Sequence, residues 1–145
     1  MPAEVHSRER ATELLAAAGE EDLVALADAC LSGGAEFAVL LAPEVGTIAA
    51  QVREPIAHDR FLLGDVLACR AEVSLGGRRG WAIRLGDNRI ATLAAAVCDA
   101  ELAAGGPTAP QIRELCVRVE REQQLSDHEE WAALAPTVVR FEELT

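Results

Sequence analysis

Apolar residues follow two different spacings along the chain, and the change in spacing divides it into three parts. Near both ends they recur every three or four positions, which places their side chains on one face of a helix. Between about residues 37 and 85 they alternate with polar residues, as in strands with one buried face. Because helical and strand parts are segregated, the pattern predicts an α+β fold, in which an antiparallel β-meander is flanked by an N-terminal helix pair and C-terminal helices.

The first part predicts two helices. Ser7 is placed to cap the first helix and Gly19 to end it. Three acidic residues then begin the second helix, where the helix dipole favours negative charge, and Gly33-Gly34 stops it. The predicted core residues of this pair are Ala11, Leu14, Leu15, Ala18, Leu23, Leu26, Ala27, Cys30 and Leu31.

The middle part predicts about four short strands. They are expected at residues 37–41, 45–53, 67–75 and 81–85, with Pro43 closing the first. The third strand alternates most clearly between apolar and polar side chains, so one of its faces is expected to point into the core.

The side chains also predict the register of the last hairpin. A three-residue loop over 77–79 places three residue pairs together on the apolar face: Leu75 with Trp81, Val73 with Ile83 and Ala71 with Leu85. The same register sets Glu72 across from Arg84 on the polar face, which is an attractive pair.

The part after residue 86 predicts three helices and a possible final strand. Asp87 or Asn88 is placed to cap a long helix. Capping boxes at 108–111 and 126–129 predict the starts of a second helix and of a short third one. Residues 137–141 alternate and predict the final strand.

Length and charge narrow the class of protein. A chain of 145 residues is expected to form a single domain over residues 1–145. Its net charge of −11 argues against nucleic acid as a partner, because phosphate contacts need clustered positive charge. No apolar run approaches the roughly 20 residues that span a bilayer, and no signal peptide is recognisable. We therefore expect a cytoplasmic protein with no membrane partner.

The charge is unevenly distributed along the chain. Residues 37–92 carry seven arginines and six acidic residues, whereas each flank has a net charge of −6. All thirteen basic residues are arginines, which suit the planar recognition of carboxylates and phosphates. The absence of lysine excludes Schiff-base chemistry and a P-loop lysine.

The four cysteines are expected to be buried free thiols. They lie far apart in the sequence among apolar neighbours, and their separations match no zinc or Cys-x-x-Cys motif. They are Cys30, Cys69, Cys98 and Cys116.

Two groups of residues in the strand region are candidates for binding. Arg60, Gly64 and Asp65 lie just before the third strand, and they predict either a site at a bent strand end or a turn followed by a β-bulge. Three arginines are expected on the polar faces of neighbouring strands, where they could grip an anion, form cross-strand pairs or lie under a partner. The small residues around them favour the partner surface. These arginines are Arg53, Arg70 and Arg84.

No motif predicts catalysis or metal binding. A phosphate loop, a nucleophile elbow and a zinc-binding His-Glu-x-x-His sequence are all missing. His128 and the two glutamates that follow it are interpreted as the exposed first turn of a helix. We therefore predict no catalytic residue and no metal site.

Several short motifs nevertheless resemble a known family in their order and spacing. They are Glu44-Val45-Gly46-Thr47, Gln51-Val52-Arg53, Arg60-Phe61-x-x-Gly64-Asp65, Arg70-x-x-Val73, Gly80, Gly86 and, in an alanine-rich helix, Asp99. Together they resemble the PhnG family, the G subunit of the bacterial carbon–phosphorus lyase system, over about residues 40–102. The family tends to have Gly-Arg-Asp and a basic residue where this chain has Gly86-Asp87-Asn88-Arg89.

The resemblance implies a subunit of a cytoplasmic complex for phosphonate use. In that family the G, H, I and L subunits convert ATP and an alkylphosphonate, such as methylphosphonate, to α-D-ribose 1-methylphosphonate 5-triphosphate and adenine. The J subunit later cleaves the C–P bond. The G subunit is regarded as accessory, so this chain is expected to bind no cofactor and not to be catalytic alone, with ATP as a substrate of the whole complex.

The residues expected to contact such a partner are Arg53, Arg60, Gly64, Asp65, Arg70 and Arg84. Two other functions remain open on the residues alone. One is a free-standing acidic protein-interaction module, and the other is a small self-sufficient enzyme that uses Arg60 and Asp65.

Overall fold

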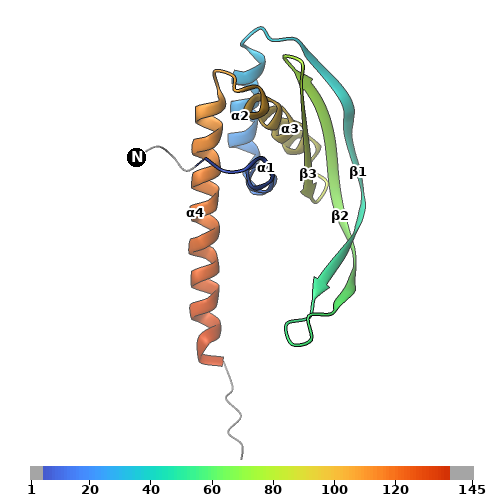
Figure 1. The fold of residues 1–145 in the computed structure, drawn as a ribbon, viewed down its shortest axis with the longest axis vertical. Helices are drawn as coiled ribbons and strands as arrows, with labels where there is room; N and C mark the ends of the chain where they lie inside the picture. The colour runs from blue at the N-terminus through green and yellow to red at the C-terminus, as the bar shows by residue number, and fades with distance from the viewer. Residues whose placement is uncertain (1–4, 138–145) are drawn as a thin grey trace, which may run out of the picture.

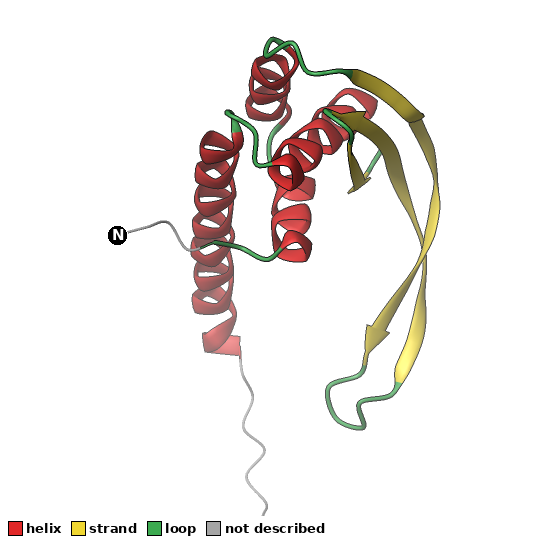
Figure 2. Ribbon diagram, turned by 45° about the horizontal axis from the view of Figure 1, so that its top comes forward, coloured by secondary structure: helices red, strands yellow, loops and turns green. Residues whose placement is uncertain are grey.

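The computed structural model describes residues 5–137, which form a three-stranded antiparallel sheet with helices on one side (Figures 1 and 2). The strand order is β1-β2-β3, so the α+β class is as predicted. We call the side that the helices cover the helix-facing side and the other the open side. The elements in chain order are α1 (Arg8–Ala17), α2 (Glu20–Leu31), β1 (Phe37–Arg53), β2 (Arg60–Leu75), β3 (Arg78–Leu85), α3 (Arg89–Ala104), α4 (Ala109–Leu134) and the 3₁₀ helix η1 (Ala135–Thr137).

Two elements extend from a body formed by α1, α2, α3 and β3. The β1–β2 hairpin and α4 both reach beyond this body, and they point in the same direction (Figure 1). No residue between 46 and 63 is buried, and none of α4 is buried from Arg121 onward. The core therefore occupies only the part of the molecule where α3 covers the sheet.

The predicted capping residues of α1 and α3 are confirmed. The Ser7 side chain accepts a hydrogen bond from the N–H of Arg10 (3.2 Å), and the predicted apolar face of α1 is buried. In α3, Asn88 provides the cap by accepting from the N–H of Ala91 (3.0 Å). Gly105 ends α3 in the left-handed conformation, with φ of 63°.

The four cysteines are buried and free, as predicted. Cys30 of α2 and Cys98 of α3 are near enough for their thiols to hydrogen bond, a proximity that sequence separation does not reveal. Burial raises the pKa of Cys116 to about 11, which keeps this thiol protonated and unreactive at neutral pH.

The separation of the first two predicted strands is wrong, because β1 is continuous from Phe37 to Arg53. Pro43 lies within it, and the pairing with β2 shifts twice, between Val39 and Leu41 and between Leu41 and Glu44. These irregularities accommodate a residue that has no N–H to donate. An edge strand tolerates such a proline, so the chain bends there without ending the strand.

The predicted register of the last hairpin is also wrong. The turn has two residues, Gly76 and Gly77, both with positive φ (57° and 79°), and Leu75 pairs with Arg78. Trp81 consequently lies opposite Glu72 instead of Leu75. This shift of three residues reverses the two faces of β3.

The predicted break near residue 126 does not occur, because α4 continues from Ala109 to Leu134. Its start at Thr108 is as predicted, but the Thr108 side chain forms no capping hydrogen bond. The buried carboxylate of Glu101 in α3 accepts from the N–H of Thr108 instead (2.9 Å). The predicted strand at 137–141 lies outside the described residues, apart from Thr137 in η1.

The backbones of α3 and β3 lie very close together at Gly80. A Cβ atom at this position would lie 2.2 Å from the carbonyl oxygen of Ala96 and 2.4 Å from the backbone nitrogen of Ala100. Both contacts are far inside van der Waals distance, so only glycine fits. The alanine-rich face of α3 and the missing side chain of Gly80 together allow the helix to lie directly on the strand.

Asp99 fixes the same contact by hydrogen bonds. Its carboxylate is buried and accepts from the backbone N–H of Trp81 in β3 (3.0 Å). It also accepts from the guanidinium of Arg8 (3.0 Å) and from the hydroxyl of Thr12 (3.3 Å) in α1. The hydrogen bond and negative charge of Asp99 in turn raise the pKa of Arg8. One side chain thereby joins α1, α3 and the outer edge of β3.

We predict that Gly80→Ala lowers the free energy of unfolding by about 3 kcal/mol or more, because the new methyl group meets backbone atoms that cannot move aside easily. Urea denaturation followed by circular dichroism measures the loss. Gly46→Ala is the matched control, since a Cβ there meets nothing within 4 Å. Equal stability of the two variants would contradict the close contact.

Asp99→Ala is expected to lower the free energy of unfolding by roughly 2–4 kcal/mol, because it leaves the buried N–H of Trp81 without an acceptor and removes the charge that holds Arg8. Asp99→Asn keeps one acceptor oxygen and should lose less. Glu13→Ala, which removes an exposed ion pair with Arg10, should change stability little. The same denaturation measurement ranks the three variants.

Candidate protein-interaction surface

Large apolar side chains are exposed on the open side of the sheet. Trp81 and Leu85 of β3 are 44% and 71% exposed, although strand residues of this size are usually covered. The register places further apolar residues of the neighbouring strands on the same side. The exposed members of this set, which we call the open-face patch, are Trp81, Ile83 and Leu85 of β3, Phe61 of β2, and Ile48 and Val52 of β1.

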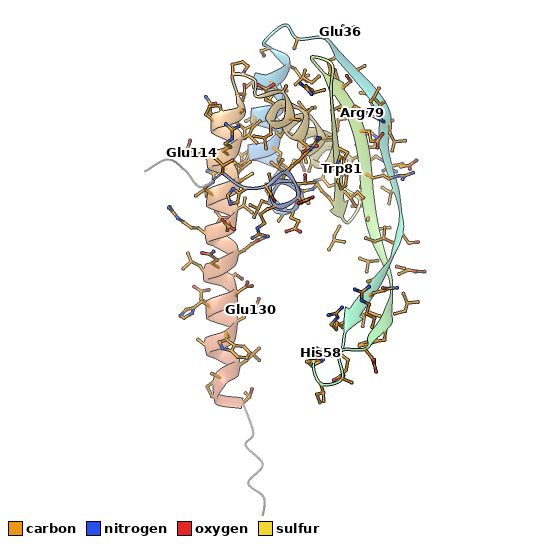
Figure 3. All side chains as sticks on the ribbon, in the orientation of Figure 1. Glu36, His58, Arg79, Trp81, Glu114 and Glu130 are labelled. Carbon is orange, nitrogen blue, oxygen red and sulfur yellow. The ribbon has the colours of Figure 1, made fainter. Side chains whose placement is uncertain are left out.

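Two ion pairs lie among the apolar side chains of the open-face patch. Arg70 of β2 pairs with Glu44, its neighbour on β1, and Arg79 pairs with Glu72 (3.2 Å). A hollow of about 290 Å³ lies between Arg70, Glu44 and the apolar side chains of Ile48 and Ile83. Arg70 lies directly opposite Ile83, and Glu72 directly opposite Trp81. The patch therefore combines exposed apolar side chains with charged pairs, and protein–protein interfaces contain both. Arg79 and Trp81 lie together on β3 in Figure 3.

Arg84 does not belong to this surface, contrary to the sequence prediction. Its partner across the hairpin is Cys69 rather than Glu72, so it projects to the helix-facing side. There its guanidinium donates to the carbonyl oxygens of Leu15 (2.9 Å) and Ala18 (2.8 Å), which end α1. Burial lowers the pKa of Arg84, and the charge of Glu20 acts in the opposite direction. Arg84 therefore stabilises the C-terminus of α1.

The predicted bulge is present where β2 begins. Ala50 pairs with Gly64, whereas Gln51 pairs with Leu62, which leaves Leu63 as an extra residue. Gly64 has a φ of 149°, a conformation that favours glycine. Asp65 is exposed on the neighbouring position. The bulge interpretation of these residues is thus confirmed.

Arg53 and Arg60 face each other near the tip of the hairpin. Both side chains are exposed, and neither forms an ion pair within residues 5–137. Like charges directly opposite on neighbouring strands repel each other. The tip itself, around His58 (Figure 3), is shaped by Glu54, whose carboxylate accepts from the N–H groups of Ile56 and Ala57.

The structure separates the predicted site residues into three places. Arg70 lies within the open-face patch, beside Ile83. Four of the others lie along the extended hairpin: Arg53, Arg60, Gly64 and Asp65. Arg84 is among the helices. Sequence reasoning missed Trp81, Ile83 and Leu85 as surface residues because it assigned them to the core. The Gly-Gly pair before β3 is the signal that could have placed them, since two adjacent glycines favour a two-residue turn.

Charged residues of both signs line a second cavity, of about 840 Å³, between α1 and the β2–β3 turn. Its charged lining consists of three arginines and two glutamates, a net charge of +1: Arg8, Arg78, Arg79, Glu9 and Glu72. Arg8 and Arg79 already pair with Asp99 and Glu72. This balance gives the cavity little excess positive charge for a polyanion. Within residues 5–137, no group of three or more His, Cys, Asp or Glu side chains is placed to hold a metal ion.

No helix among the described residues is long and apolar enough to cross a membrane. The fold and this surface define a small, acidic α+β protein with an exposed apolar sheet face suited to contact with another protein. A comparison with protein families matches residues 6–145 to PhnG, described as phosphonate metabolism protein PhnG. The chain therefore belongs to the PhnG family, and it takes part in phosphonate metabolism. A search of curated proteins found no match.

Family membership agrees with the way the motif residues meet in the fold. Glu44 and Arg70, 26 positions apart, form an ion pair across β1 and β2. Gly80 and Asp99 both lie where α3 packs against β3. These spacings are therefore explained by contacts of the fold.

Arg84→Ala is expected to lower the free energy of unfolding by about 1–3 kcal/mol, because two carbonyl oxygens at the end of α1 lose their donor. Arg70→Ala removes an exposed pair and should cost at most about 1 kcal/mol. Thermal and urea denaturation of both variants distinguishes a structural arginine from a surface one. A larger loss in Arg70→Ala than in Arg84→Ala would refute this assignment.

Proposed function

We propose that this chain is an accessory, structural subunit of the cytoplasmic carbon–phosphorus lyase core complex. In that complex it acts with the H, I and L subunits to convert ATP and an alkylphosphonate, such as methylphosphonate, to α-D-ribose 1-methylphosphonate 5-triphosphate and adenine. The J subunit belongs to the same assembly. The match to the PhnG family over nearly the whole chain carries this proposal.

The electrostatics of the chain support an accessory role. ATP and phosphonates are polyanions, whereas this chain has a net charge of −11 and repels them at long range. Three of its exposed arginines, Arg8 of α1 and Arg70 and Arg79 on the open side, already pair with carboxylates. The partner subunits therefore bind the ATP and the phosphonate, and this chain contributes to a transferase as one of its subunits.

The open-face patch supports contact with a partner as the means of this contribution. An apolar face with exposed Trp81 and Leu85 is costly in water. Covering it with another subunit removes that cost and brings the ion pairs among its apolar side chains into the interface. On this proposal the chain holds and shapes the catalytic partner chiefly through its sheet.

Arg53→Glu and Arg70→Glu are each expected to weaken assembly with the I-type and H-type chains of the same organism about tenfold or more, because a reversed charge would meet the groups that now attract the arginine. Co-expression, purification and the native mass of the complex measure the effect. Arg121→Glu, on α4 away from the sheet, is the matched control and should assemble normally.

The double variant Glu44→Arg/Arg70→Glu refines this test. It keeps an ion pair between β1 and β2 but reverses its polarity, so a merely intramolecular role for Arg70 predicts restored assembly. If both single reversals assemble like the native chain, the sheet is not the contact surface. A chain that remains a monomer or homodimer and ignores both partners would instead be a free-standing interaction module.

A further inference from the structure

The two outer edges of the sheet are treated differently by the fold. At the β3 edge, the carbonyl oxygen of Arg79 accepts from the guanidinium of Arg8 (2.8 Å), and the N–H of Trp81 donates to Asp99 (3.0 Å). These contacts occupy groups that would otherwise be free to pair with another strand. At the β1 edge no helix plays this role over residues 44–53, none of which is buried.

The alternation of hydrogen bonding identifies the free groups of β1. The N–H of Glu54 donates to the carbonyl oxygen of Asp59 (2.8 Å), so residue 54 turns its backbone groups toward the β2 side of the hairpin. In an antiparallel pair this orientation alternates from residue to residue. The backbone N–H and C=O groups of Val45, Thr47, Ala49, Gln51 and Arg53 therefore point away from β2.

This stretch lacks the usual protection of an edge strand. Proteins shield such edges with proline, lysine, bulges or a covering element. In β1 the proline and both irregularities of its own backbone precede residue 45, and the chain has no lysine. From Val45 to Arg53, β1 contains no extra residue of its own, since the bulge opposite Ala50 and Gln51 is in β2. This exposed stretch is long enough to hold a whole added strand.

Two arginines indicate the charge of what binds there. Arg53 and Arg60 lie opposite each other without an ion-pair partner in residues 5–137. A strand added to β1 would place one of its side chains directly beside Arg53, at the distance of a cross-strand pair. An aspartate or glutamate at that position would relieve the repulsion between the arginines.

A second copy of this chain would not supply that acid. The only acidic residue of β1 is Glu44. When two copies of β1 pair antiparallel and continue one sheet, residues directly opposite each other share a face. Glu44 and Arg53 are nine positions apart and project to opposite faces, so they cannot meet in this way. Two copies would also bring together net charges of −11 each.

We propose that the free edge of β1, from Val45 to Arg53, receives an extended strand of a partner subunit, and that this strand carries an acidic side chain beside Arg53. The added strand becomes the fourth strand of the sheet and pairs with the outward backbone groups of β1, which the chain's own helices leave unpaired. This inference rests on the proposed function, because it identifies how the chain meets a partner of the phosphonate complex.

Amide hydrogen exchange at single-residue resolution tests the proposal, in the isolated chain and in its complex with the I-type and H-type chains. In the isolated chain the outward amides of Thr47, Ala49 and Gln51 should exchange rapidly, while those of Gly46 and Ile48 are slower. In the complex the exchange of the three outward amides should slow at least 100-fold. The inward amides, already paired with β2, serve as the internal control.

Ala49→Pro provides an independent measurement. It removes one outward N–H without touching the pairing with β2, a change that edge strands tolerate, and it should weaken the complex at least tenfold. Ala49→Ser, which keeps the N–H, should bind like the native chain. Unchanged exchange of the inward amides shows that the proline variant still folds.

The outcomes separate this inference from the proposed function. A complex that forms while Thr47, Ala49 and Gln51 still exchange rapidly overturns the inference and leaves the proposed function standing. Protection of these amides in the isolated chain that rises with its concentration identifies a second copy as the occupant and overturns the inference too. If no complex forms with either partner, both proposals fail.

Discussion

The contact between α3 and β3 is the interaction on which the rest of this fold depends. Gly80 allows the helix backbone to lie against the strand, and Asp99 then holds the strand by the N–H of Trp81. Because Asp99 also holds Arg8, the position of α1 is set by the same carboxylate. Gly80 and Asp99 therefore fix the same contact. A change that moves β3 at this point also moves α3 and, through Arg8, α1.

This contact divides the molecule into a covered part and an uncovered part. Where α3 lies on the sheet, the side chains of the helix-facing side are buried and form the core. Beyond α3, the β1–β2 hairpin has no helix on either side, and an isolated two-stranded hairpin is only marginally stable in water. The chain therefore builds a packed body and extends from it a hairpin that its own helices do not cover.

The sequence predicted the helices well because their signals are local. Ser7 and Asn88 bind the N–H groups of the first turn, and Gly105 adopts the left-handed conformation that ends α3. The capping box at 126–129 is also a local signal, but it predicted a helix start that does not exist, because α4 continues through it. Such a motif marks a helix start only if the preceding helix has stopped, and the residues around Ser126 are good enough helix formers to continue it.

Hydrophobicity did not show which face of β3 points into the core. The apolar surface on the open side of the sheet could therefore not be predicted from the sequence. Trp81, Ile83 and Leu85 look like core residues, yet the core side of β3 consists of Gly80, Ala82 and Arg84. Small residues lie inside because α3 needs the space, and Arg84 lies inside because α1 ends above it. Arg53 and Arg70, by contrast, were correctly placed on the surface, since nothing in their own strands requires them inside.

The exposure of both tryptophans has a practical consequence for spectroscopy. Trp81 lies on the open side of the sheet, and Trp131 lies on the uncovered half of α4. They are the only tryptophans of the chain, and it has no tyrosine. An indole already in contact with water changes its emission little when the protein unfolds, but strongly when another surface excludes that water. Intrinsic fluorescence of this protein therefore reports the arrival of a neighbour far better than the loss of its own structure.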